Sequence, residues 1–115
     1  MNKLIILSSL LILLLCCNKE DRPEVLYIAG TITDKIDDSP IPDAQISIVR
    51  SVSVSIEIID TTLISDVNGQ FECEIIPVDD FPYHLSIVSI GHKQVNLDID
   101  RDKENNVFTI ELERF

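Results

Sequence analysis

Residues 62–76 read Thr-Leu-Ile-Ser-Asp-Val-Asn-Gly-Gln-Phe-Glu-Cys-Glu-Ile-Ile, and this stretch decides the fold. The pair Asn68-Gly69 stands between two short runs in which apolar residues alternate with polar ones. Alternation with a period of two is the pattern of a β-strand with one buried face. Asn and Gly both tolerate the positive φ that tight hairpin turns need. The stretch therefore predicts two strands joined by a hairpin turn.

The chain beyond residue 24 repeats this pattern. Short segments rich in β-branched residues alternate with turn-forming loops, and no segment has a sustained apolar period of 3.6 residues. About seven strands in roughly 90 residues are typical of an antiparallel β-sandwich, so we expect an all-β domain of that kind. The expected strand segments are 25–33, 44–50, 52–59, 62–65, 70–76, 84–90, 94–99 and 107–113.

Alternation also assigns a core face to most of these segments. The residues between the core positions, such as Glu72 and Glu74, then form a charged outer face. Residues 50–58 alternate Ser with Val or Ile without a turn residue, so they are expected to form an exposed edge strand of weak register. The predicted core residues are Ala44, Ile46, Ile48, Phe71, Cys73, Ile75, Leu85, Ile87, Val95, Leu97, Ile99, Phe108, Ile110 and Leu112.

The N-terminal residues have the composition of a secretory signal. Lys3 precedes an apolar run from Leu4 to Leu15, which stops at Cys16 and Cys17. The run is shorter than the roughly 20 residues that a helix needs to cross a bilayer. A signal peptide is therefore expected in preference to the alternative, an uncleaved transmembrane anchor.

A leucine-rich run that stops at Cys resembles the lipobox of bacterial lipoproteins, in which the Cys is acylated and becomes the mature N-terminus. This resemblance implies lipid attachment at Cys17, with Cys16 as the alternative. The implied organisation is a lipoprotein signal peptide over residues 1–16, a lipidated tether over 17–24 and one β-sandwich domain over 25–115. Several acyl chains give essentially permanent membrane attachment.

The residues after Cys17 suggest where the lipoprotein is displayed. Lys19, Glu20 and Asp21 resemble the surface-export signal of Bacteroidota-type lipoproteins. The resemblance implies an outer-membrane, lipid-anchored protein exposed at the cell surface. A periplasm-facing domain is the alternative.

Charge and cysteine content exclude several classes of partner and bond. Without residues 1–16 the chain has 8 Lys and Arg against 20 Asp and Glu, a formal charge of −12. Binding of nucleic acid or of anionic lipid head groups through a basic patch is therefore not expected. Cys73 is the one cysteine outside the signal and lipidation region, so no internal disulfide can form, and its place on an alternating strand predicts a buried small hydrophobe.

Three motifs in order resemble the carboxypeptidase regulatory-like domains. Residues 28–34 and 40–48 resemble the opening "G-x-V-x-D … P-L-x-G-A-x-V-x-V" of that family. Residues 65–71 resemble its "T-D-x-x-G-x-F" hairpin, and residues 85–93 resemble its "L-x-V-S-x-x-G-Y" strand. The match spans 25–113 and implies a transthyretin-like β-sandwich, a module that occurs beside zinc carboxypeptidases and in many surface proteins.

The motif residues have structural reasons of their own. Gly30 within a strand suggests a bulge or a close backbone approach, and Gly69 supplies positive φ. Asp66 is expected to form an Asx-turn with the residues after it. His92 replaces the usual aromatic residue of the family and removes an aromatic contact. The full set of structural motif residues is Gly30, Pro42, Asp66, Gly69, Phe71 and Gly91.

No residue pattern points to catalysis or to a bound cofactor. The two histidines, His84 and His92, lack the spacing of a zinc hydrolase motif. No strained elbow such as GxSxG is present for a nucleophile. The protein is therefore expected not to be an enzyme and to need no cofactor.

One acidic segment imitates a calcium loop. Its carboxylates stand at alternate positions, but Lys103 occupies the position that demands Gly and Thr109 the position of the bidentate Glu. A solvated hairpin loop without metal is expected, with weak calcium binding as the alternative. The candidate ligands are Asp98, Asp100, Asp102 and Glu104.

Together these patterns predict a non-catalytic, lipid-anchored cell-envelope module that binds a protein partner. With no Trp and few other aromatic residues, protein contact is favoured over sugar stacking. The alternatives are a structural spacer of the cell envelope and an accessory subunit of an outer-membrane nutrient or glycan receptor.

Overall fold

The computed structural model describes residues 22–115 and contains seven β-strands. Their bounds are β1 Leu26–Asp34, β2 Gln45–Ser53, β3 Ile56–Ile64, β4 Gln70–Ile75, β5 Tyr83–Val88, β6 Val95–Asp98 and β7 Asn105–Leu112. No helix among the described residues is long and apolar enough to cross a membrane. The expected all-β class is confirmed.

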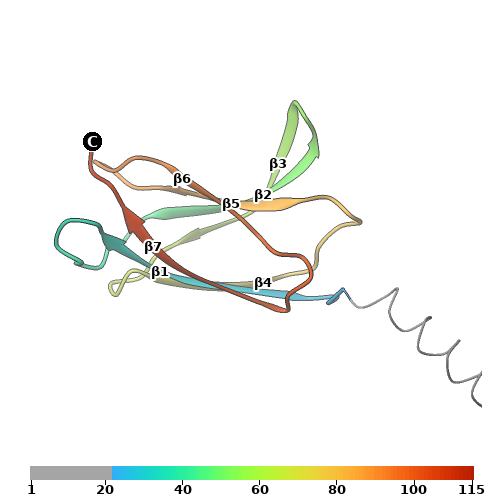
Figure 1. Ribbon diagram of the computed structural model, residues 1–115, viewed down its shortest axis with the longest axis horizontal. Coiled ribbons are helices and arrows are strands. Elements are labelled where there is room, and N and C mark those ends of the chain that lie inside the picture. The colour runs from blue at the N-terminus through green and yellow to red at the C-terminus, as the bar shows by residue number, and fades with distance from the viewer. Residues whose placement is uncertain (1–21) are drawn as a thin grey trace, which may run out of the picture.

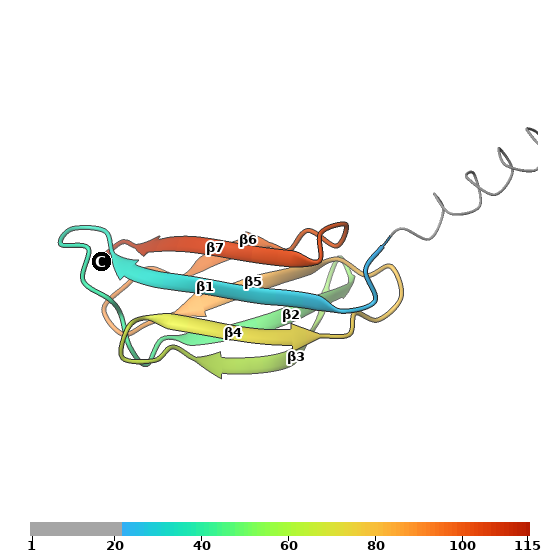
Figure 2. The same ribbon diagram turned by 90° about the horizontal axis from the view of Figure 1, so that it is seen from below.

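The strands form two sheets packed face to face as a β-sandwich (Figures 1 and 2). One sheet has three strands in the order β4-β1-β7, and the other has four in the order β3-β2-β5-β6. In Figure 2 the three-stranded sheet lies in front, with β3 and β4 along one flank and β6 and β7 along the other. The predicted sandwich of seven strands is therefore confirmed.

The turn at Asn68-Gly69 does not make the predicted hairpin. The strands on either side of it, β3 and β4, belong to different sheets and do not pair. Gly69 has a φ of 71°, whereas Asn68 is not among the residues with positive φ. The turn bonds to neighbouring segments instead, because the Gly69 carbonyl accepts from Ile32 N at 2.8 Å and Ser65 Oγ donates to the Ile41 carbonyl at 2.8 Å. It carries the chain from one layer to the other.

One of the five strand pairings is parallel, which the prediction of an antiparallel sandwich missed. β1 and β7 run in parallel, from Tyr27 opposite Asn105 to Asp34 opposite Leu112. β6 ends in the four-stranded sheet at the same end of the sandwich at which β1 begins. The loop 99–104 therefore crosses between layers, and the strand after it must run in the direction of β1. For this reason it is not the hairpin loop that we expected.

The Ser-rich segment 50–58 contains a turn that the sequence did not signal. β2 continues to Ser53, Val54 and Ser55 form the turn, and β3 returns along β2. Register shifts between Ile48 and Val49, and between Ser51 and Ser53, mark irregularities in this pairing. The expected exposed edge is confirmed only for residues 56–58, which lie on the outer strand β3, whereas residues 50–53 belong to the inner strand β2.

The predicted core faces are confirmed. Ten of the predicted core residues are buried, and Cys73, Val95, Leu97 and Phe108 pack against them half-buried. Gly30 leaves space for the Phe71 ring, since a Cβ at this position would lie 2.5 Å from that ring. The sequence assigned no core role to the other buried apolar residues, which are Leu26, Ile28, Ile32, Ile41, Val49 and Tyr83.

We expect Phe71→Ala to destabilise the domain by about 3–5 kcal/mol, because the change empties a buried site between the sheets. The control, Glu74→Ala on the exposed face of the same strand, should change stability by no more than about 0.5 kcal/mol. Urea unfolding of both variants measures the difference. A larger loss from the control would mean that the faces of β4 are reversed.

Candidate functional site

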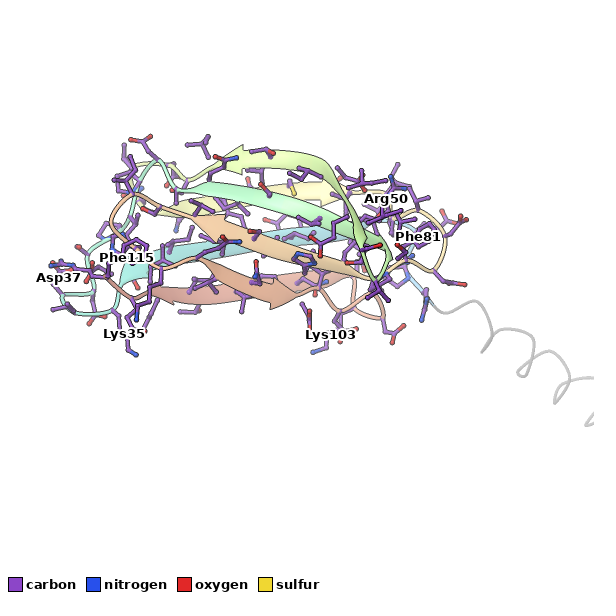
Figure 3. All side chains as sticks on the ribbon, turned by 90° about the horizontal axis from the view of Figure 1, so that it is seen from above. Lys35, Asp37, Arg50, Phe81, Lys103 and Phe115 are labelled. Carbon is purple, nitrogen blue, oxygen red and sulfur yellow. The ribbon has the colours of Figure 1, made fainter. Side chains whose placement is uncertain are left out.

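The sandwich has two chemically different ends. Figure 3 places Arg50, Phe81 and Lys103 at one end and Lys35, Asp37 and Phe115 at the other. The first, called here the proximal end, is where the described chain begins. There Arg22 bonds to Asp80 Oδ1 at 3.0 Å and to Asp102 Oδ1 at 3.1 Å. The second, the distal end, consists of the loops 35–44 and 89–94, the turn 65–69 and residues 113–115.

A buried carboxylate organises the distal end. Asp34, the last residue of β1, has a side chain that is 4% exposed. Its Oδ2 accepts from Arg114 Nε at 2.7 Å and lies 2.9 Å from His92 Nε2. Its Oδ1 accepts from Ile36 N at 2.8 Å. Three separate segments of the chain are therefore joined at one side chain.

Strand pairing explains why these residues meet. Asp34 lies opposite Leu112 in the parallel pair, so Arg114 follows two residues later at the same edge. An isolated bridge pairs His92 with Arg114, which brings the loop after β5 to this point. From the sequence, His92 was a missing aromatic contact and one of two histidines without zinc-site spacing. Its contact with Asp34 could not be predicted from the sequence, because Asp34 and its bridge partner Arg114 lie 58 and 22 positions away along the chain.

The surroundings shift the ionisation of the acidic groups here. The hydrogen bond from His92, followed by that from Arg114, holds the pKa of Asp34 far below its usual range. The Ser39 hydroxyl and amide lower the pKa of Asp37. Asp34 raises the pKa of Arg114 in turn. The network therefore carries fixed charges at neutral pH.

His92 is held in a way that leaves no free ring nitrogen. Its Nε2 faces Asp34, and its Nδ1 lies 3.2 Å from the Ile90 carbonyl. A histidine that acts as a general base needs one nitrogen directed at a nucleophile or a water. Asp34, His92 and Arg114 therefore join the end of β1 to two other segments, and this cluster is called here the clasp.

A shallow groove lies beside this clasp. Its volume is about 520 Å³, and its walls include Pro40, Ile41, Pro42 and Ile90. Ile90 is fully exposed and Phe115 is 89% exposed. The Phe115 amide donates to the Gly91 carbonyl at 3.2 Å, so the two apolar side chains belong to adjacent segments. Apolar side chains around a charged, rigid base suit contact with another macromolecule.

Several of the structural motif residues lie in turns and loops of the distal end. Asp66 Oδ1 accepts from Asn68 N and Gln70 N, both at 2.9 Å, which is the expected Asx-turn. Pro42 lies in the loop that enters β2 and lines the groove. Gly91 has a φ of 83° and faces open space. Ser65 Oγ accepts from Ala44 N at 2.9 Å.

The four acidic candidates for calcium do not converge. Asp102 bonds to Arg22, and Asp100 Oδ1 accepts from Asp102 N at 2.9 Å. The buried Asn106 amide holds the loop by donating to the Asp100 and Lys103 carbonyls. Asp98 lies on β6, and Glu104 precedes β7. Within residues 22–115 no group of three or more His, Cys, Asp or Glu side chains is arranged to hold a metal ion.

Five residues named from the sequence lie outside the described part of the chain. These are the lipidation candidates and the export residues, Cys16, Cys17, Lys19, Glu20 and Asp21. The predicted state of Cys73 agrees with the fold, since it is half-buried and burial raises the pKa of its thiol.

No protein-family model matches the sequence, and no curated protein matches it significantly. Solved structures resemble it at low identity. The 3-chlorocatechol 1,2-dioxygenase of Rhodococcus opacus 1CP matches 84% of this chain and 62% of its own, at 10% identity and a TM-score of 0.59. The C-terminal domain of the shaft pilin spaA of Lactobacillus rhamnosus GG matches 81% of this chain and all of its own, at 14% identity and a TM-score of 0.57.

A DUF3823 family protein of Bacteroides uniformis ATCC 8492 also resembles the chain, at 12% identity and a TM-score of 0.54. The match covers 81% of this chain and 44% of that protein, so the chain spans less than half of its length. At such identities the likeness establishes the β-sandwich fold alone.

The clasp predicts a specific acid sensitivity. A carboxyl whose pKa is lowered by folding stabilises the protein above its ordinary pKa of about 4, and this contribution is lost as the pH falls below that value. We therefore expect wild type to melt at a higher temperature than Asp34→Asn at pH 5, with the gap narrowing toward pH 2. Asp38→Asn is the matched control, because Asp38 is exposed and has a positive φ that Asn tolerates. A difference in melting temperature between wild type and Asp34→Asn that stays constant with pH would contradict a lowered pKa for Asp34.

Calcium should raise the melting temperature no more than magnesium does, since both would only screen the acidic surface. A real site at 100 times its dissociation constant would add about 2.7 kcal/mol. Asp100→Asn keeps the oxygen that accepts from Asp102 N and removes only charge. If calcium raises the melting temperature more than magnesium does, and Asp100→Asn removes the difference, the loop binds calcium.

Proposed function

We propose that this chain is a lipid-anchored, non-catalytic module of the cell envelope that binds a protein partner through its distal end. The family that we propose for it is the carboxypeptidase regulatory-like domain, on the three motifs described above. The organisation is a signal peptide over residues 1–16, a tether from Cys17 to residue 24 and a domain over 25–115. The resemblance of Lys19, Glu20 and Asp21 to a surface-export signal supports display at the outer surface of the outer membrane.

The orientation of the domain supports this role. Five positions separate Cys17 from Arg22, and an extended chain of that length reaches at most about 18 Å. Arg22 is bonded to two proximal loops through Asp80 and Asp102, so the proximal end stays close to the lipid. The nine residues of β1 span about 30 Å and carry the distal end away from the membrane.

The observation that carries the proposal is the apolar rim of the distal groove. Ile90 lines the groove, and Ile36 and Phe115 are exposed on other segments of the distal end, around a base fixed by the Asp34 clasp. A rigid base lowers the entropy that a partner must overcome on binding. The absence of a free nitrogen on His92 supports a binding role over a catalytic one.

The test is cross-linking of the full chain on intact cells. We expect Ile90→Asp to abolish a cross-linked partner adduct, because a carboxylate at the rim would have to be desolvated on binding. Ile76→Asp, at an exposed apolar position of the proximal end, should leave the adduct intact. Cys17→Ser should release the protein from the membrane fraction.

Two results would contradict the proposal. If both aspartate variants lose the adduct equally, the distal end is not the binding surface. If Cys17→Ser and Cys16→Ser both remain in the membrane fraction, the lipid anchor is wrong.

A further inference from the structure

The sandwich has four outer strands, and they differ in how well their free edges are protected. Exposed edges invite pairing with other chains unless they are short or charged. β6 has four residues, β4 carries Glu72 and Glu74, and β7 carries Glu111. β3 has nine residues, with Ile59 61% exposed and Ile64 58% exposed. It is the longest of the four edges, by one residue over β7, and it carries Glu57 and Asp60.

Of the two acidic residues on β3, Glu57 and Asp60, Asp60 is directed inward. Ile48 lies opposite Thr61 and Val49 opposite Ile59, so Asp60 is left without a partner as a bulge. Arg50 Nη2 lies 3.3 Å from Asp60 Oδ1 and holds that carboxylate toward β2. Beyond the bulge, residues 61–64 are Thr-Thr-Leu-Ile and carry no charge. Half of the edge thus lacks any charge that would oppose an added strand.

We propose that β3 accepts an extended strand from a partner protein along its free edge, and that this strand alternates apolar residues with Lys or Arg. The apolar residues would pack on Ile59 and Ile64. The cations follow from the charge of this flank, since residues 56–75 contain five acidic side chains and no Lys or Arg. Main-chain hydrogen bonds to β3 would supply the affinity. The alternating side chains of the added strand would supply the selectivity.

A recess beside the end of β3 would receive one side chain of the added strand. It has a volume of about 470 Å³ and is lined by Ile64 and Asp66 together with Phe71, Glu72 and neighbouring residues of β1. Figure 2 shows β3 and β4 on the same flank, where the recess adjoins both strands. Its mixed apolar and acidic lining suits a long side chain that ends in a cation.

A second copy of this chain fits the edge less well. Residues 22–115 carry 18 acidic and 7 basic side chains, so two copies repel each other. A two-fold antiparallel pairing of β3 with β3 also turns the second copy end over end. Its proximal end would then lie at the distal end of the first, which two short tethers on one membrane do not allow. This exclusion rests on the proposed lipid anchor.

The experiment uses the full lipidated chain in nanodiscs of phosphatidylcholine and a synthetic peptide in which Lys and Val alternate over seven residues. Amide hydrogen exchange is followed by mass spectrometry. At twice its dissociation constant, the peptide should slow exchange in residues 56–64 by about threefold. The same peptide with Glu for Lys, and one with a central Pro, should have no effect.

Variants distinguish pairing of the peptide with the β3 edge from general attraction of the peptide to the acidic surface. Glu57→Lys should weaken protection by the Lys peptide, whereas Glu111→Lys on the opposite flank should leave it unchanged. Ile90→Asp should also leave it unchanged, so failure of the distal-end proposal would be distinguishable from failure of this one. Equal protection by the Lys and Glu peptides, no protection of 56–64, or protection that rises with protein concentration alone would overturn the proposal.

Discussion

The parallel pairing of β1 with β7 is the constraint on which the rest of the structure depends. It places Asp34 and Leu112 side by side, and so brings Arg114 to the buried carboxylate. It also makes β1 the central strand of its sheet, with β4 on its other side. Gly30 then lies between Phe71 and Phe108 on the two neighbouring strands, and its missing side chain leaves room for the Phe71 ring. One pairing thus sets both the packing of the core and the geometry of the distal clasp.

The hydrogen bonds of the clasp order distal loops that have little apolar surface of their own. A buried carboxylate is costly unless its charge is compensated and its oxygens accept hydrogen bonds. Asp34 meets both needs with Arg114, His92 and the Ile36 amide. Removal of Arg114 would leave the carboxylate without its guanidinium counter-charge, and removal of either other partner would cost it a hydrogen bond. The distal loops are therefore fixed relative to one another, although no disulfide joins them.

The sequence predicts the layers of this fold better than its connections. Alternation along each strand is a local property, so Ile46, Ile110 and the other core positions could be assigned correctly. Strand pairing depends on contacts between distant segments, and Asn68-Gly69 has the same local signature whether its two arms pair or separate into opposite sheets. The clasp was missed for the same reason. Asp34 and His92 each lie in a recognisable motif, but Arg114 lies outside all three, and only the pairing of β1 with β7 joins them.

The outer strands of the sandwich differ in how their exposed residues are placed. An acidic side chain on an outer face is compatible with either register and also discourages association, so acidic residues occur on β4 and β7. β3 differs because the bulge at Asp60 changes which face its residues occupy, and Arg50 draws the carboxylate back toward β2. The bulge turns Ile59 away from the face that Thr61 and Leu63 occupy, so that Ile59 and Ile64 are both left exposed. An edge of this kind is a liability in a free protein, and a tether that fixes the proximal end restricts which chains can approach it.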